Sequence, residues 1–250
     1  MCKKVVFEIL KMLWEGLLNL FYPEGVSCSI CGDEIGDVEI DLCKNCIGEI
    51  EFIKDSFCEK CGKILSDANK SLCSDCRRKD HYFVKGRSVG VYEKGLKEYI
   101  YLFKYNRYRN LAAPLGDLMG IYIDRFFSRR DFDLITYIPS HQERIRERGF
   151  NQARLLANRV GERLNLESKG LLKRRSETIK QSKLARAERI ENIKGKFILK
   201  DGILVKDKSI LLVDDIYTTG ATVNEASKVF LDKGADKIQV ITLATGRDVE

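Results

Sequence analysis

The sequence lacks an uninterrupted apolar run where a signal peptide or a membrane-spanning segment would begin. Charged residues Glu8, Lys11 and Glu15 break the apolar stretch between Met1 and Tyr22, and no small-residue cleavage site follows it. Both features argue against a secretory signal and against a transmembrane helix. Apolar residues instead recur there at roughly helical spacing, namely Val6, Leu10, Leu13, Leu17 and Leu20. Residues 1–25 are therefore predicted to form an amphipathic helix, which packs on the protein itself or lies on a membrane surface.

Histidine is scarce, and no residue stands out as a catalytic nucleophile. The two histidines are His81 and His141, and a lone histidine is more often a surface or capping residue than a catalytic base. The sequence therefore gives no support to a mechanism that forms a covalent enzyme intermediate.

Positive charge is concentrated in one part of the chain. The formal net charge is +7, yet residues 1–140 contain 21 Lys and Arg against 21 Asp and Glu, whereas residues 141–200 contain 17 against 7, an excess of 10. A solvated helical face is one explanation of such an excess. A surface that binds an anionic ligand or nucleic acid is the other. The length of 250 residues allows one substantial core and one smaller module.

Eight of the nine cysteines form four Cys-x-x-Cys pairs. The pairs fall into two halves with the same C-x2-C-x11-C-x2-C spacing, and the second half is offset from the first by 30 residues, which predicts two similar modules. Each Cys-x-x-Cys turn presents two sulfur ligands, and tetrahedral Zn²⁺ needs four. The predicted zinc ligands are Cys28, Cys31, Cys43, Cys46, Cys58, Cys61, Cys73 and Cys76.

Two structural Zn²⁺ ions are expected, because four thiolates at each site leave no open coordination position for chemistry. A disulfide framework is the alternative, and the missing secretory signal argues against it. Two pairing schemes remain open: sequential sites, Cys28 to Cys46 and Cys58 to Cys76, or an interleaved arrangement of the same residues. Modules this short lack an extensive apolar core, so bound metal would stabilise them.

From residue 81 onward the pattern is that of an α/β domain, in which apolar runs alternate with segments of helical periodicity. Strands are predicted at residues 88–92, 133–138, 210–213 and 237–243, and helices at residues 93–105, 111–127 and 221–231. A further helix is expected over residues 153–164, because its apolar residues share one face while its arginines lie elsewhere.

The segment ILLVDDIYTTGAT, Ile210 to Thr222, carries the strongest functional signal. Its apolar residues predict a strand buried on both faces, and the strand is expected to end at Asp214 and Asp215. A Thr- and Gly-rich loop then precedes a helix, whose unpaired N–H groups and partial positive charge bind phosphate. Paired carboxylates beside a phosphate site indicate contacts to hydroxyl groups, to hydrated Mg²⁺, or to both.

This segment resembles the phosphoribosyl-pyrophosphate (PRPP) motif of type I phosphoribosyltransferases. The resemblance implies that Asp214 and Asp215 hold the ribose hydroxyls of PRPP, which binds with Mg²⁺. The loop would hold the 5-phosphate through Thr218, Thr219, Gly220, Ala221 and Thr222. The turn at Ser140 and His141 would contact pyrophosphate. A polar and basic segment, Lys173 to Asn192, would correspond to the flexible loop that closes over the ligand in these enzymes, with Lys183, Arg186 and Arg189 near pyrophosphate.

Two further segments resemble signatures of the ComF/GntX family of competence-associated proteins: RERGFNQARLLA, Arg146 to Ala157, and RRSETIKQSKLARAERIENIKGKF, Arg174 to Phe197. With the cysteine modules and the PRPP motif, the resemblance covers nearly the whole chain. It implies an α/β fold of the type I phosphoribosyltransferase kind, with a parallel sheet flanked by helices and an N-terminal double zinc-finger module with four cysteines at each site. The expected domains are the helix at residues 1–25, the zinc modules at residues 26–80 and the phosphoribosyltransferase-like domain at residues 81–250.

The resemblance implies a protein of DNA uptake and natural transformation that binds PRPP and Mg²⁺ and contacts single-stranded DNA or other competence proteins. The alternative is an active phosphoribosyltransferase of nucleotide metabolism that moves the phosphoribosyl group to a nitrogen acceptor. We expect the protein in the cytoplasm, either free or at the inner face of the membrane. The sequence assigns no catalytic residue and no pocket for an acceptor.

Overall fold

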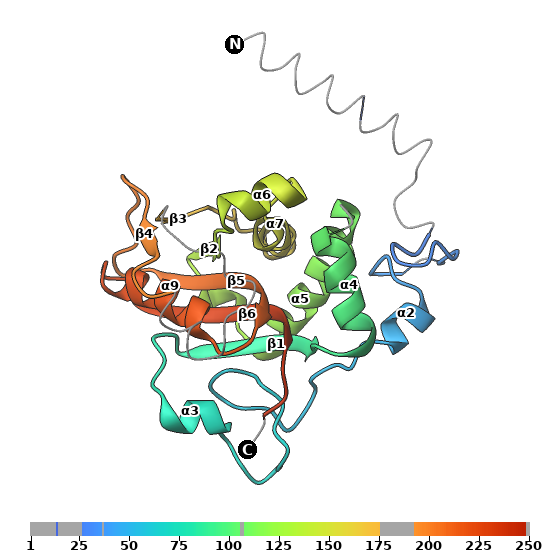
Figure 1. Ribbon diagram of the computed structural model, residues 1–250, viewed down its shortest axis with the longest axis horizontal. Helices are drawn as coiled ribbons and strands as arrows, with labels where there is room; N and C mark the ends of the chain where they lie inside the picture. Colours follow the sequence, from blue (N-terminus) through green and yellow to red (C-terminus); the bar gives the residue numbers. More distant parts are fainter. Residues whose placement is uncertain (1–13, 15–26, 37, 106–107, 176–192, 249–250) are drawn as a thin grey trace. The chain divides into compact units, whose positions relative to one another are not determined.

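The computed structural model describes Trp14 and residues 27–36, 38–105, 108–175 and 193–248 (Figure 1). The chain forms two compact units, Met1–Ile47 and Gly48–Glu250, which divide between the two predicted cysteine modules. Apart from Trp14, the predicted helix at residues 1–25 lies outside the described residues. The domain boundaries expected after residues 25 and 80 stay predictions.

Four parallel strands form the main sheet of the larger unit, in the order β1-β6-β5-β2. Their bounds are β1 Lys85–Val91, β2 Leu134–Tyr137, β5 Ser209–Tyr217 and β6 Lys237–Thr245. In the central strand β5, four successive residues from Ile210 to Val213 are fully buried, as a parallel strand covered on both faces requires. The predicted α/β fold with a parallel sheet is therefore confirmed.

Helices cover both faces of this sheet (Figure 1). On one face, α5 (Ala112–Phe126) packs on β1 and β6, and α7 (Gln152–Leu164) packs on β2 and β5. On the other face, α9 (Ala221–Leu231) packs on β5 and β6. The fourth long helix is α4 (Lys94–Tyr105), which follows β1. The apolar face predicted for α7 is buried, because Ala153, Leu156, Ala157, Val160 and Leu164 all lie in the core.

Shorter elements complete the described part of the chain. They are the helices α2 (Lys44–Gly48), α3 (Ser74–Arg78) and α6 (Gln142–Arg148), and the 3-10 turns η1 (Arg109–Leu111) and η2 (Arg129–Asp131). Two strands that the sequence did not predict, β3 (Leu172–Arg174) and β4 (Phe197–Leu199), form a separate antiparallel pair. The chain between them includes residues 176–192, which lie outside the described residues. Among the described helices, none has the length and apolar character needed to cross a membrane.

Strand β5 continues beyond the end predicted for it. Its pairing with β6 runs through Asp214, opposite Thr242, to Tyr217, opposite Thr245. The two acids therefore lie inside the carboxyl end of the strand and not in the turn that follows. Backbone hydrogen bonds to a neighbouring strand do not depend on side-chain polarity, so polar residues here did not end the strand.

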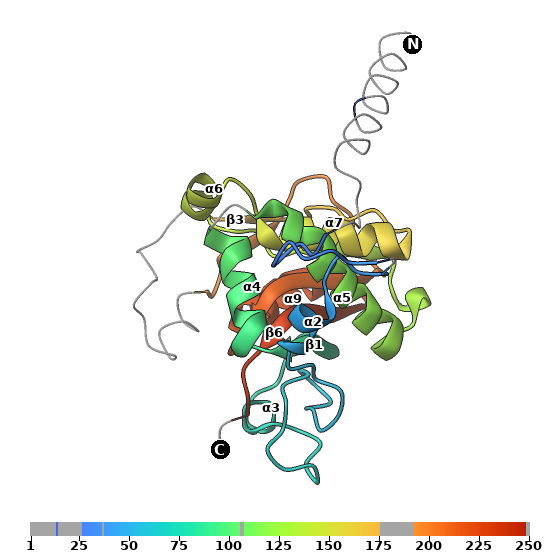
Figure 2. The same cartoon turned by 90° about the vertical axis from the view of Figure 1, so that its right-hand side faces the viewer.

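Within the larger unit, α3 and the loops around it gather beside β1 (Figures 1 and 2). These loops carry the second half of the cysteine repeat. An antiparallel bridge between Phe57 and Ile64 forms the base of its first turn, and Ile64 also pairs with Arg247 in the segment after β6. The second half of the repeat is thus joined to the C-terminal segment.

Candidate functional site

The two cysteine modules repeat the same turn geometry. In the first, the Cys28 N–H donates to the Asp33 carbonyl at 2.7 Å, and in the second the Cys58 N–H donates to the Lys63 carbonyl at 2.7 Å. These pairs are offset by the 30 residues that separate the two halves of the sequence repeat. The repeat predicted from spacing is therefore present in the backbone.

Each module brings four sulfur atoms together, within 4.8 Å of one another. The first cysteine set consists of Cys28, Cys31, Cys43 and Cys46, and the second cysteine set of Cys58, Cys61, Cys73 and Cys76. The structure thus pairs the cysteines sequentially, which the sequence had left open. One sulfur–sulfur distance in each set is 3.6 Å, close to the edge of about 3.8 Å expected for a zinc tetrahedron with Zn–S bonds of about 2.3 Å. Both sets therefore fit structural Zn²⁺.

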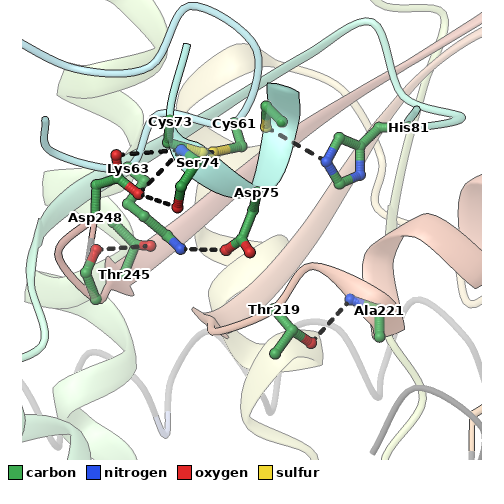
Figure 3. Close-up of polar contacts among 12 residues, drawn as sticks. Cys61, Lys63, Cys73, Ser74, Asp75, His81, Thr219, Ala221, Thr245 and Asp248 are labelled. Carbon is green, nitrogen blue, oxygen red and sulfur yellow. Dashed lines mark hydrogen bonds and ion pairs between the residues drawn. The ribbon is translucent and has the colours of Figure 1, made fainter. Parts of the chain in front are cut away.

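The second cysteine set is held against the C-terminal segment by polar contacts (Figure 3). The Ser74 hydroxyl donates to the Asp248 carboxylate at 2.6 Å, and the Ser74 N–H donates to the same group at 3.1 Å. The Asp248 N–H in turn donates to the Ile64 carbonyl at 3.0 Å. Lys63 and Asp75 form a mostly buried ion pair at 2.7 Å within the module. A buried carboxylate with several donors fixes both segments that it joins.

The same module also packs directly on strand β1. The Gly86 N–H donates to the Lys60 carbonyl at 2.7 Å, and the Arg87 guanidinium donates to the Glu59 carbonyl at 2.9 Å. Gly62, with φ +77°, approaches so closely that an added Cβ would lie 2.8 Å from the Arg87 Cα. Only glycine allows both this backbone conformation and this approach. The turn that carries Cys58 and Cys61 is therefore packed directly against β1, an edge strand of the main sheet.

Tyr217 lies between the second cysteine set and the predicted phosphate loop, which comprises residues 218–222. It shares one hydrophobic core cluster with Cys58, Cys61 and Cys73, and its ring makes an edge contact with Phe83 at 6.3 Å between centroids. On its other side, a Cβ added to Gly220 would overlap the Tyr217 hydroxyl. The phosphate loop thus rests on a side chain that packs among the metal ligands.

The predicted phosphate loop leads into the N-terminus of α9, as the sequence indicated. Gly220 has φ +74° and occupies the N-cap position without a side-chain cap. The Thr219 hydroxyl accepts a weak hydrogen bond from the Ala221 N–H at 3.4 Å (Figure 3), while Thr218 is exposed and Thr222 half-buried. The first N–H groups of a helix have no partner within the helix. This N-terminus therefore presents N–H donors and the positive end of the helix dipole to an anion bound in the loop.

The acidic pair lies half-buried at the carboxyl end of β5. The Asp215 N–H donates to the Asp214 carboxylate at 2.9 Å, and Lys104, at the end of α4, forms an ion pair with Asp215 at 2.7 Å. Burial, reinforced by the charge of Asp215, raises the pKa of Asp214 to about 8. Sequence reasoning did not identify Lys104, because nothing near it in the chain indicates which strand its helix faces.

The turn after β2 is organised by residues of the RGFNQ segment. The Ser140 hydroxyl donates to the Asn151 side-chain carbonyl, and the Asn151 amide donates to the Ile138 carbonyl, each at 3.0 Å. His141 caps α6, because its Nδ1 accepts a hydrogen bond from the Glu143 N–H at 3.3 Å. In this structure Asn151, which sequence reasoning placed in a motif without a role, fixes the turn that carries Ser140.

Arg148 of the same segment joins α6 to α4. Its guanidinium donates to the Tyr105 hydroxyl at 3.2 Å and to the Gln152 side-chain carbonyl at 3.1 Å, and it lies 4.9 Å from the centre of the Tyr105 ring. Arg148 is buried, so this arginine has a structural role. The pyrophosphate contacts predicted at Lys183, Arg186 and Arg189 lie outside the described residues.

Two family models match this chain. A double zinc ribbon domain matches residues 17–77, which contain both cysteine sets. A phosphoribosyl transferase domain matches residues 145–249, which contain the acidic pair, the phosphate loop and α9. The matched ranges agree with the two kinds of site found in the structure.

Curated relatives are similar to this chain over most of their length. The competence protein ComFC of Streptococcus pneumoniae is 29% identical over 232 residues, covering 93% of both chains. Competence protein F of Haemophilus influenzae is 28% identical and covers 90% of this chain and 93% of its own. The DNA utilization protein YhgH of Escherichia coli is 30% identical over 172 residues, covering 66% of this chain and 74% of its own.

Proposed function

The chain belongs to the ComF family, in which a double zinc ribbon precedes a phosphoribosyltransferase domain, and from this premise we propose that it binds PRPP with Mg²⁺ and acts in DNA uptake. The relatives named for competence and DNA utilization support the biological role. The observation that carries PRPP binding is the acidic pair at the end of β5, directly ahead of the phosphate loop and the N-terminus of α9.

Each part of this site suits one part of PRPP. The loop from Thr218 to Thr222 and the dipole of α9 would hold the 5-phosphate, and Asp214 and Asp215 would accept hydrogen bonds from the ribose hydroxyls. Bound Mg²⁺ would neutralise charge on pyrophosphate. Ser140 and His141, with Lys183, Arg186 and Arg189 of the predicted closing segment, would supply further contacts to pyrophosphate. Lys104 holds Asp215 in place and would share this carboxylate with the ligand.

Calorimetric titration with PRPP and Mg²⁺ tests this proposal. Native protein should bind, and Asp214→Asn/Asp215→Asn should lose at least about tenfold in affinity, because hydrogen bonds to charged groups contribute about 1.5–3 kcal/mol each. Asp232→Asn/Glu98→Gln is the matched control, since it removes two negative charges at exposed positions away from the loop. Equal affinity in the native protein and the acidic-pair variant would overturn the site assignment.

The alternative function is transfer of the phosphoribosyl group to a nitrogen acceptor. The bond between C1 and pyrophosphate oxygen would break, a bond between C1 and the acceptor nitrogen would form, and pyrophosphate would leave with its electron pair. The protein would act by positioning and by charge stabilisation, which agrees with the lack of a nucleophile. Release of pyrophosphate in a screen of nitrogen acceptors distinguishes the two functions, with the acidic-pair variant as the inactive control.

Contact with single-stranded DNA is the third part of the proposal. The excess of 10 positive charges over residues 141–200 supports it. Because phosphate contacts release counterions, affinity for single-stranded DNA should fall steeply as salt concentration rises. Affinity that does not change with salt would contradict it.

Thiolate zinc sites favour a reducing compartment, so we place this activity in the cytoplasm, free or at the inner face of the membrane, in contact with other competence proteins.

A further inference from the structure

A cavity of about 530 Å³ opens beside the turn after β2. Its walls come from η1, the end of β2, α6, the first turns of α7, β3 and the residue after β4, and they include Tyr137, Ser140 and Phe150. None of its lining residues belongs to β5 or to the phosphate loop. The volume lies within the range of about 300–1,000 Å³ typical of small-molecule sites. We call this space the basic cavity.

The charge of the basic cavity is of one sign. Arg109, Arg154 and Lys200 line it, and no carboxylate does. In the parts of the chain that the structure describes, none of these three side chains forms an ion pair. An uncompensated group of cations in a concave surface attracts anions.

Two other arginines of helix α7 do form ion pairs. Arg159 pairs with Asp117 at 2.8 Å, and Arg163 pairs with Asp124 at 3.3 Å. Arg154, which lies nearer the start of the same helix, faces the basic cavity instead. A solvated helical face would explain one unpaired arginine, but it does not explain why cations from three separate elements converge on one cavity.

The remaining lining suits a planar ring. The Arg109 guanidinium lies 5.4 Å from the centre of the Phe150 ring, and the half-buried Tyr137 presents a second aromatic side chain. The Tyr137 hydroxyl and the Lys200 ammonium converge above Gly170, where an added Cβ would lie 2.5 Å and 3.1 Å from them. Aromatic rings beside cations bind nucleobases by stacking and phosphates by charge.

We propose that the basic cavity binds a nucleotide, with its phosphate at Arg109, Arg154 and Lys200 and its base against Tyr137. This site adjoins the PRPP site, because Ser140, a proposed pyrophosphate contact, also lines the basic cavity, but none of the three cations of the cavity is assigned to PRPP. Its nucleotide is either a free mononucleotide or one unit of a single nucleic-acid strand. Both sources offer the same phosphate and base.

Binding of thymidine 5′-monophosphate to the full chain tests the proposal. Arg154→Ala/Lys200→Ala should weaken this binding by at least about tenfold, because it removes two of the three cations that would contact the phosphate. Lys97→Ala/Arg130→Ala is the matched control, since both residues are exposed and lie outside the cavity, and it should bind like native protein. Thymidine, which has no phosphate, should not compete.

A short oligothymidylate separates the two sources. If the same variant also loses affinity for the oligomer, the cavity holds a unit of a strand; if only the mononucleotide is affected, the ligand is a free nucleotide. Equal binding of the mononucleotide by variant and native protein, or no binding at all, would overturn the proposal, as would equally effective competition by inorganic phosphate. PRPP affinity should be unchanged in Arg154→Ala/Lys200→Ala, and its loss would contradict a separate site.

Discussion

The first and second cysteine sets have the same spacing and the same turn geometry, but they occur in different surroundings. Cys31 of the first set is exposed, and this set lies in the unit Met1–Ile47. In the second set Cys58, Cys61 and Cys73 are fully buried in a core cluster that includes residues of β5, β6 and α9. The second metal site is therefore a structural part of the unit that carries the phosphate loop.

This difference has a physical cause in the contacts of the second module. Gly62 and Lys60 pack on β1, Ser74 binds Asp248, and Tyr217 lies between the ligands and Gly220. Equal ligand spacing thus does not make the two sites equivalent in energy. Loss of metal from the second cysteine set should therefore disturb the phosphate loop, whereas loss of metal from the first cysteine set should not.

The largest expected effect comes from removing metal ligands. Cys58→Ser/Cys73→Ser should unfold the larger unit, because a structural zinc site contributes about 10 kcal/mol or more and a whole domain is stable by only about 5–15 kcal/mol. Cys28→Ser/Cys43→Ser should leave the larger unit folded with one zinc ion. Near-ultraviolet circular dichroism and metal analysis measure both, and equal damage by the two variants would break the comparison.

A smaller effect is expected from Gly220→Ala. Gly220 and Gly202 both have φ +74°, but only Gly220 has neighbours within 4 Å of an added Cβ. Gly220→Ala and its control Gly202→Ala should each lower the free energy of unfolding by about 1–2 kcal/mol, because alanine is strained in the left-handed backbone conformation. Gly220→Ala should lower it by about 1–3 kcal/mol more, because its Cβ overlaps Tyr217. Denaturant unfolding measures the difference, and PRPP affinity should fall only in Gly220→Ala. Equal losses would show that Tyr217 does not support the loop.

Next in size is the contact between Ser74 and Asp248. Asp248→Ala leaves a buried N–H and hydroxyl of Ser74 without this acceptor, which costs about 1–3 kcal/mol. Zinc should then be released faster to a chelator from the second cysteine set and at the native rate from the first. Asp201→Ala, which removes a carboxylate that is 95% exposed, is the control and should change neither rate. Faster release from both sets would contradict the distinction.

The smallest effect is a pH dependence at the acidic pair. Because burial raises the pKa of Asp214 to about 8 and binding needs its carboxylate form, affinity for PRPP with Mg²⁺ should rise about tenfold from pH 6 to pH 7 and level off above pH 8. In Asp214→Asn, the remaining dependence of PRPP affinity on pH is the part that the ligand itself contributes. If native protein shows the same dependence on pH as this variant, titration of Asp214 is ruled out.

The same raised pKa affects stability with the opposite sign. The unfolded chain releases the Asp214 proton near its usual pKa, whereas the folded chain keeps it to about pH 8, so stability falls as pH rises between these values. Asp214→Asn should therefore gain stability relative to native protein from about pH 4 to pH 8. Thermal unfolding across this range measures the gain, and a constant difference would contradict it.

Local features of the fold followed well from the sequence. The predicted helix at residues 221–231 matches α9, because an apolar period and a preceding Gly mark its bounds. The cysteine repeat predicted both metal sets. Strand β5 was predicted too short, because Asp214 and Asp215 suggested a turn while the pairing with β6 continues through them.

Contacts between distant parts of the chain did not follow from the sequence. Lys104 meets Asp215, and Ser74 meets Asp248, only because the order of strands brings their elements together. The strands β3 and β4 are three residues each, too short to give a periodic pattern. Spacing predicted which cysteines bind metal, but packing decides which of the two sites belongs to the core.

Hydrogen-exchange mass spectrometry with and without PRPP and Mg²⁺ tests the central claim most directly. The claim is that the acidic pair, the phosphate loop and the start of α9 form the PRPP site in the larger unit. Slower exchange over residues 214–224, with no change over residues 27–47, is the result we predict. Unchanged exchange over residues 214–224 at saturating PRPP, or equal slowing over residues 27–47, would contradict it.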